Sequence, residues 1–230
     1  MGAKRVIDGV HVVPMGMANA FLIEGDDGLI LIDAGFPAKE AAVFGALREL
    51  GRSRDQLKHL IFTHGHPDHI GSAAAIVQET GARTYMHPLD MSMAESGGPF
   101  RPLKPAPGLL APVLCRLFYH PNAPVEPVSI DQPLTDGELL PIAGGIEVIH
   151  TPGHCAGQVA LLWRPGRMLF AGDVASNMMG LGDPLGFENL EEGRASQRKL
   201  GGLSFDAAGF GHGKPIAHAA STGFRNKWGI

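Results

Sequence analysis

The stretch FTHGHPDHIGS (residues 62–72) places three histidines and one aspartate within six positions, at His64, His66, Asp68 and His69. It continues the apolar run LKHLIF (57–62), which predicts a short buried strand that ends where the histidines begin. A single histidine beside a strand is usually a core or surface residue, but packing alone does not require three imidazoles so close together. We therefore predict a metal site in the loop that follows this strand.

Three later stretches repeat the arrangement of an apolar strand followed by a glycine-rich loop with a metal-capable side chain. EVIHTPG leads to His154, MLFAG to Asp173 and AAGFG to His212. Strand ends in a layered α/β protein gather at one edge of the sheets, where ligands commonly bind. We expect these side chains to meet the histidines of the first stretch at that edge.

The resulting set holds more ligands than one cation needs, because a four-coordinate catalytic zinc uses three protein ligands and keeps one position open. The set is His64, His66, Asp68, His69, His154, Asp173 and His212. It predicts two divalent ions that share one carboxylate. Two such ions ~3.5–4 Å apart can share a water and lower its pKa to about 7, which makes a hydroxide nucleophile available. Imidazole and carboxylate ligands suit Zn, Mn, Fe or Co, so the ligand set does not choose the metal. We expect zinc.

The order of strand and helix patterns predicts an α/β fold. Residues 1–35 have the pattern of β-structure with a turn at GDDG (25–28), and apolar residues at helical spacing follow in 37–51 and 70–81. Strand patterns return at 82–88, 146–154, 158–166 and 167–176, a polar-faced helix is predicted at 188–203, and a last strand pattern covers 205–215.

Residues 96–133 interrupt this order with a proline-dense segment that contains the apolar run LLAPVLCRLFY (109–119). Irregular segments of this length are uncommon in compact domains unless they are functional loops or lids. We interpret the segment as an insertion that forms a cap within a single domain spanning residues 1–230. Exposed apolar residues at this density usually cover or bind something. The candidate substrate-pocket residues are Phe100, Leu114, Phe118, Tyr119, Met178, Met179 and Phe187. A homodimer contact is the alternative role for these residues.

Composition limits the classes of partner. The chain has 230 residues, 44% hydrophobic and 18% charged, with a net charge of −4, so a nucleic-acid partner is not expected. We find no apolar run that would span a membrane or serve as the core of a signal peptide, and we expect a cytoplasmic protein with a small-molecule substrate. Cys115 and Cys155 lie far apart and predict no disulfide framework. Cys155 follows His154 and is either a thiolate ligand or, as we favour, a packed residue.

The motifs THGHPDH, TPGH, FAGD and GFGHG, in this order, together resemble the metallo-β-lactamase superfamily, as does the preceding LILIDAG (29–35). The resemblance implies a four-layer αββα sandwich with metals at the edge of two sheets. Carried over residue by residue, it implies that His64, His66 and His154 bind a first metal, that Asp68, His69 and His212 bind a second, and that Asp173 bridges the two. It also implies that Asp68 transfers protons from the bridging water, and that Asp33 orients ligand histidines; the alternative for Asp33 is a turn residue after a strand.

Asp173 combined with His69 resembles the glyoxalase II and N-acyl-homoserine lactonase branch, which implies hydrolysis of an ester, thioester or lactone of a small, partly apolar substrate. The sequence departs from both patterns. Only 18 residues follow His212, whereas glyoxalase II has a longer C-terminal helical region, and DVASNMMGLG (173–182) lacks the tyrosine of the lactonases. The alternatives are a persulfide dioxygenase with one iron, a phosphodiesterase acting on small or lipid-like substrates, and a non-catalytic metal-binding module. A weak β-lactamase side activity is compatible with the main prediction.

Overall fold

A seven-stranded sheet forms the first half of the fold in the computed structural model, which describes residues 2–229. The strand order is β1-β2-β3-β4-β5-β6-β8. The strands are β1 (Lys4–Ile7), β2 (Val10–Pro14), β3 (Asn19–Gly25), β4 (Gly28–Ile32), β5 (Leu57–Ile61), β6 (Arg83–Met86) and β8 (Gln132–Pro133). Pairing is antiparallel from β1 to β4, with the predicted turn between β3 and β4, and parallel from β4 to β8.

A second sheet of five strands, in the order β14-β12-β11-β10-β9, packs against the first. Its strands are β9 (Leu139–Leu140), β10 (Ile146–His150), β11 (Val159–Trp163), β12 (Met168–Phe170) and β14 (Ala207–Gly209). Only the β12–β14 pair of this sheet is parallel. A separate antiparallel pair joins β7 (Lys104–Pro105) to β13 (Gly186–Phe187).

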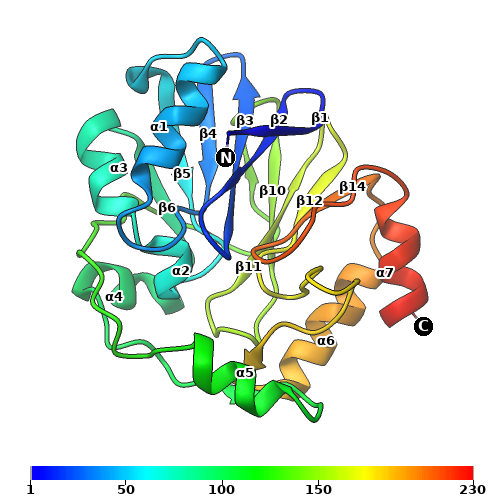
Figure 1. The fold of residues 1–230 in the computed structure, drawn as a ribbon. Coiled ribbons are helices and arrows are strands. Elements are labelled where there is room, and N and C mark those ends of the chain that lie inside the picture. Colours follow the sequence, from blue (N-terminus) through cyan, green and yellow to red (C-terminus); the bar gives the residue numbers. More distant parts are fainter. Residues whose placement is uncertain (1, 230) are drawn as a thin grey trace.

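Helices cover the outer face of each sheet (Figure 1). On the first sheet lie α1 (Glu40–Glu49), α2 (Pro67–Ile70), α3 (Ala73–Thr80) and α4 (Pro88–Ser96), with a short 3₁₀ turn at Arg54–Gln56. On the second lie α6 (Leu190–Gly201) and α7 (Ala220–Trp228). The helix α5 (Ala111–Phe118) lies apart, below the ends of both sheets.

The buried apolar side chains form three clusters, which are separated by the two sheets. Successive residues of a strand point to opposite faces of its sheet and so enter different clusters. In β3, Phe21 and Ile23 enter the cluster between the sheets, whereas Leu22 joins the cluster beneath α1 and α3. A third cluster fills the space between the second sheet and the helices α6 and α7. The expected four-layer αββα sandwich is confirmed.

The loops after β5, β10, β12 and β14 leave the sheets at the end that faces α5 in Figure 1. These are the four loops in which the sequence predicted metal ligands. The helices predicted at 37–51, 70–81 and 188–203 are present with ends shortened by one to three residues.

Residues 96–133 are mostly irregular but contain α5, and they also supply β7 and β8. The sequence analysis did not anticipate α4 or α7. Within residues 2–229, none of the helices has the length and apolar character needed to cross a membrane. The assignment of residues 1–230 to one domain stays a prediction.

The cluster between the sheets provides a test of this packing. Phe170 is 1% exposed and its ring meets that of Phe21 edge-on at a centroid distance of 5.2 Å. We expect Phe170→Ala to lower the free energy of unfolding by about 3–5 kcal/mol, because it leaves a cavity between the sheets. The matched control Met179→Ala, at a side chain 91% exposed, should change it by less than about 0.5 kcal/mol. Urea unfolding followed by circular dichroism measures both, and equal effects would contradict the described core.

Candidate metal centre

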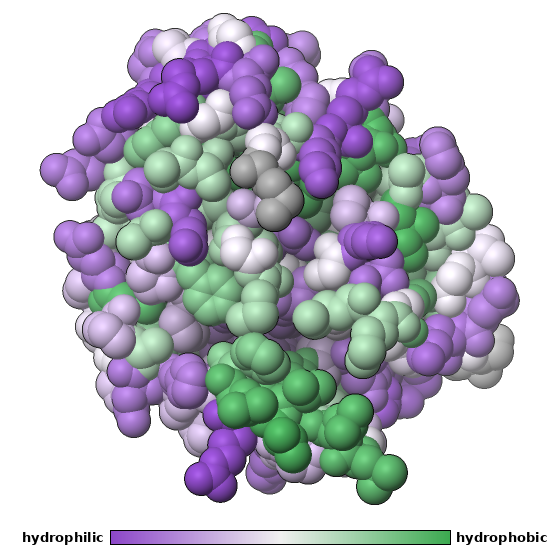
Figure 2. Space-filling model, viewed as in Figure 1, coloured by the Kyte–Doolittle hydropathy of each residue, from purple (hydrophilic) through white to green (hydrophobic). Residues whose placement is uncertain are grey.

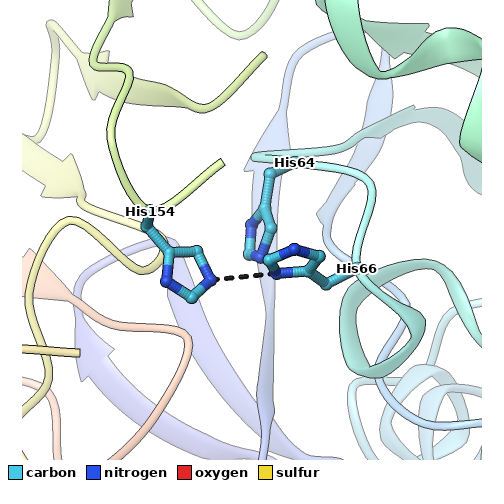
Figure 3. Close-up of side chains that lie close together, drawn as sticks. All are labelled: His64, His66 and His154. Atoms are coloured by element: carbon cyan, nitrogen blue, oxygen red, sulfur yellow. Dashed lines mark hydrogen bonds between the residues drawn. The ribbon is translucent and has the colours of Figure 1, made fainter. Parts of the chain in front are cut away.

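Three histidines from two loops face one another at the edge of the sheets (Figure 3). His64 and His66 follow β5, and His154 follows β10 on the other sheet. Their ring centroids lie 4.7–5.0 Å apart, and Nδ1 of His66 is 2.9 Å from Nε2 of His154. All three side chains are at most 3% exposed. The structure therefore brings together the three side chains expected to hold the first metal.

A second group lies beside it and contains both carboxylates of the predicted set. Nε2 of His212 is 3.2 Å from Oδ2 of Asp68 and 3.2 Å from Oδ2 of Asp173. Oδ1 of Asp173 lies 3.6 Å from Nε2 of His69, and Oδ2 lies 3.6 Å from Nε2 of His154. Asp173 thus lies between the two groups, the place expected for a bridging ligand.

Asp33 is hydrogen-bonded to His69 directly and to His64 through Thr63. Its carboxylate accepts hydrogen bonds from the Thr63 backbone amide (2.8 Å), the Thr63 hydroxyl (2.8 Å) and Nδ1 of His69 (2.9 Å). Since the Thr63 hydroxyl donates to Asp33, it accepts from Nδ1 of His64, which is 3.1 Å away. Both histidines therefore donate through Nδ1 and turn Nε2 toward the site. Asp33 has φ 61°, an uncommon conformation outside glycine that these hydrogen bonds hold.

Backbone carbonyls perform the same task for two other histidines. Nδ1 of His154 donates to the Gly186 carbonyl at 2.7 Å, and Nδ1 of His212 donates to the Met17 carbonyl at 2.9 Å. Such partners fix the tautomer and ring orientation of a metal-binding histidine. The sequence analysis identified neither carbonyl, nor Thr63, because no residue type marks a backbone acceptor and Thr63 is distinguished only by its place before His64.

Gly211 shows how closely the loop after β14 approaches the cluster. A Cβ at this position would lie 2.1 Å from Oδ1 of Asp173 and 2.5 Å from Cε1 of His69. Only glycine fits there without displacing a candidate ligand.

Burial keeps the imidazoles of the first group neutral. Loss of hydration lowers the pKa of His64 and of His66 well below the ordinary histidine value, and the neighbouring histidines lower both further. Burial also lowers the pKa of His154, although Asp173 opposes the shift. A neutral imidazole is the form that binds a metal.

In the second group, by contrast, the carboxylates favour the charged forms of the titratable side chains. Burial alone would raise the pKa values of Asp68 and Asp173, but His69 and His212 hold both below the usual range. Burial alone would lower the pKa of His69, but Asp33, Asp173 and Asp68 raise it to about 9. This half of the site therefore favours positive charge, which a divalent cation supplies.

A divalent metal fits the atoms that the protein leaves without partners. Among the described residues, Nε2 of His64, His66 and His69 and Oδ1 of Asp173 are buried without a hydrogen bond. Buried polar atoms are rarely left unpaired, since this costs about 1–3 kcal/mol each. Among residues 2–229, potential ligand atoms within 4.8 Å of one another occur in four sets. They are His64 with His66 and His154, His64 with His69 and Asp173, Asp68 with His69 and His212, and His66 with Cys155 and Glu188.

Cys155 is not oriented as a free thiolate ligand, although it lies within 4.8 Å of ligand atoms of His66 and Glu188. Its side chain is buried, its thiol donates to Oδ2 of Asp90 at 3.0 Å, and burial together with Asp90 raises its pKa well above the ordinary value. It is a neutral, packed thiol, as the sequence analysis favoured.

The candidate substrate-pocket residues have different environments. Phe100 and Phe187 are buried at 3% and 1% exposure, so their rings contribute to packing. Leu114 is half-buried, and Phe118 is 47% exposed. Met178 and Met179 are 63% and 91% exposed. Their role in a pocket stays a prediction.

Tyr119 is the member of this set that reaches the metal centre, with its ring 5.2 Å from that of His66. It also forms one wall of a surface cavity of about 270 Å³ beside α5, together with Leu103, Pro112 and Cys115. The outer side of α5 exposes Leu109, Leu110, Val113, Leu117 and Phe118, which form the apolar patch at the bottom of Figure 2.

Comparison with known proteins agrees with this geometry. A sequence profile of the metallo-beta-lactamase superfamily matches residues 13–212. The chain is 30% identical to the probable metallo-hydrolase YflN of Bacillus subtilis (strain 168) over 227 residues, which cover 90% of this chain and 85% of that protein. It is 28% identical to the hydroxyacylglutathione hydrolase GloC of Haemophilus influenzae, over 72% of this chain and 71% of that protein.

Among solved structures, the metallo-beta-lactamase family protein TTHA1429 from Thermus thermophilus superposes with a TM-score of 0.72 at 26% identity. The match covers 97% of this chain and 79% of that one. Several other curated relatives are covered over only 61% or 62% of their length.

Thr63 provides a test of the orienting hydrogen bonds. We expect Thr63→Val to weaken zinc binding by about 10–100-fold, because the link between Asp33 and His64 is lost while the side-chain shape is kept. Thr63→Ser keeps the hydroxyl and should bind zinc as the wild type does. Competition with a chromophoric chelator measures the affinity, and equal affinity of the Val and Ser variants would show that the hydroxyl does not orient His64.

Proposed function

The chain belongs to the metallo-beta-lactamase superfamily, and we propose that it is a hydrolase with two divalent metal ions that cleaves an ester, thioester or lactone. The observation that carries the proposal is that Nε2 of His64, His66 and His69 and Oδ1 of Asp173 are buried without a hydrogen bond in one cluster of potential ligands. Two ions suit this set, because it contains two adjoining groups of three potential ligands, His64 with His66 and His154, and Asp68 with His69 and His212, and Asp173 lies beside both. Zinc is the metal we favour.

The ligands divide as the distances suggest. His64, His66 and His154 would hold one ion, Asp68, His69 and His212 the other, and Asp173 would contact both. When bound, the ions supply Lewis acidity toward a carbonyl oxygen and lower the pKa of a water to about 7.

Asp68 is the residue we assign to proton transfer. Its side chain is 21% exposed, whereas that of Asp173 is 5% exposed, so Asp68 lies on the open side of the centre. His69 and His212 keep its carboxylate ionised. One carboxylate oxygen of Asp68 would take the proton of the attacking water and return it to the departing oxygen or sulfur.

The cavity beside Tyr119 supports a small, partly apolar substrate. A volume of about 270 Å³ is slightly below the range for pockets that hold drug-sized ligands, so it suits one acyl or aryl group. Tyr119 lines this cavity and its ring lies 5.2 Å from that of His66, so the cavity adjoins a residue that contacts the histidine cluster. The names of YflN and GloC support hydrolysis, and that of GloC supports an acyl substrate.

The test is hydrolysis of a panel of lactones, thioesters and aryl esters by zinc-loaded protein. We expect Asp68→Asn, assayed at saturating zinc, to lower kcat/KM by about 10²–10⁴-fold, because the amide cannot accept the proton. The matched control Asp27→Asn, in the exposed turn between β3 and β4, should retain full activity. Full activity of Asp68→Asn would exclude the assigned role.

Metal analysis of the protein as isolated, before zinc is added, separates the proposal from the dioxygenase alternative. Two zinc ions per chain are expected. One iron per chain with oxygen uptake on a persulfide substrate would replace the hydrolase assignment by the oxidoreductase.

A further inference from the structure

Arg101 connects the proline-rich segment to the loops that carry the first metal group. Its Nε donates to Oε1 of Glu188 at 2.7 Å and its Nη1 donates to the Leu89 carbonyl at 2.9 Å. Its Nη2 pairs with Oδ1 of Asp90 and lies 3.0 Å from the Cys155 sulfur. The metal-site chemistry does not use any of these four contacts.

Asp90 extends the connection into both histidine loops. It is fully buried, and its carboxylate accepts from the amide of Gly65 at 2.9 Å and from the amide of Gly157 at 2.8 Å. Gly65 separates His64 from His66, and Gly157 lies three residues after His154. A single carboxylate therefore holds the loop after β5 and the loop after β10 at a fixed separation.

Gly157 is required for this approach, and Gly65 leaves little room for a larger residue. A Cβ at Gly157 would lie 2.5 Å from Cγ of Asp90, and one at Gly65 would lie 3.2 Å from its Cβ. The two loops thus close directly on the Asp90 side chain.

Glu188 holds the loop of His154 from the other side. Its Oε2 accepts from the amide of Ala156 at 2.9 Å, and its own amide donates to the His154 carbonyl at 3.2 Å. The preceding pair β7–β13 joins Lys104 and Pro105 of the proline-rich segment to Phe187 and Gly186, whose carbonyl orients His154.

The backbone of Arg101 anchors the other end of the segment. Its carbonyl accepts a hydrogen bond from the Tyr119 hydroxyl, and the neighbouring Phe100 amide donates to the Pro121 carbonyl at 2.9 Å. Tyr119 is the residue whose ring lies against His66. Arg101 is therefore the residue at which the proline-rich segment, Tyr119 and the two histidine loops meet.

We propose that Arg101 is a positioning residue that couples the docking of residues 97–125 to the geometry of the His64, His66 and His154 group, acting through Asp90 and Glu188. The inference rests on the proposed metal centre. Arg101 pairs with a carboxylate that is buried between the two loops, and a buried carboxylate that loses its partner leaves an uncompensated charge that its surroundings must reorganise to accommodate. That reorganisation disturbs the amides of Gly65 and Gly157, and with them the histidines.

Two measurements on Arg101→Ala test the coupling without any substrate. Zinc affinity, from chelator competition, should fall at least about 10-fold, as is typical when partners behind metal ligands are removed. Hydrogen exchange should accelerate in peptides covering residues 97–125, and should stay unchanged in those covering α7. Asp90→Asn, which keeps the shape of the side chain, should reproduce the loss of zinc affinity.

Two variants serve as controls. Arg167→Ala removes an arginine whose 2.9 Å ion pair with Asp206 lies on the exposed surface, and it should change neither measurement. Arg101→Lys keeps the charge and should recover part of the zinc affinity. If Arg101→Ala does not fold, the zinc affinity and hydrogen exchange of Arg101→Lys are compared with those of the wild type instead.

The coupling is wrong if exchange in 97–125 accelerates while zinc affinity stays within two-fold of wild type, or if both stay unchanged. It is also wrong if Arg167→Ala weakens zinc binding as much as Arg101→Ala does. Wild-type protein that binds zinc but hydrolyses none of the tested substrates would refute the proposed reaction alone, because neither measurement depends on turnover.

Discussion

The burial of imidazoles and carboxylates at the edge of an apolar sandwich is the constraint on which this structure depends. Polar groups removed from water need partners, and charged groups need opposite charges. The protein meets this need with Asp33, the Thr63 hydroxyl and two backbone carbonyls on the outer side of the histidines. The inner nitrogens of His64 and His69 face the site without partners. The site is therefore defined as much by hydrogen bonds behind the rings as by the rings themselves.

The layered fold makes this arrangement available to residues that are far apart in sequence. Alternation in the strands divides apolar side chains between the inner and outer clusters, so both sheets can be covered on both faces. The strands β5, β10, β12 and β14 then end at the same edge, and each contributes to the site in the loop that follows. Gly211 illustrates the precision that results, because its missing Cβ makes room for Asp173.

Strand endings and histidine spacing were enough to predict an α/β fold and the side chains that the structure brings together, since a strand pattern followed by a ligand in a glycine-rich loop is local in sequence. The four layers were implied by the resemblance to the metallo-β-lactamase superfamily. Residues that hold the histidine loops through contacts distant in sequence could not be predicted in this way. Asp90 lies at the start of α4 with no motif around it, and Arg101 lies in a segment whose proline content indicated only irregular chain. The pocket residues show the same limit, because apolar character did not distinguish buried Phe100 from exposed Met179.

The candidate ligands come from both sheets, and this has a consequence for the lifetime of the protein. His64 and His69 follow a strand of one sheet, whereas His154, Asp173 and His212 follow strands of the other. An ion bound among them would act as a cross-link between the two halves of the sandwich and would favour the folded state by mass action. Chains made during metal starvation would lack this cross-link, open more often and be degraded sooner, so the cellular abundance of the protein would follow the metal supply.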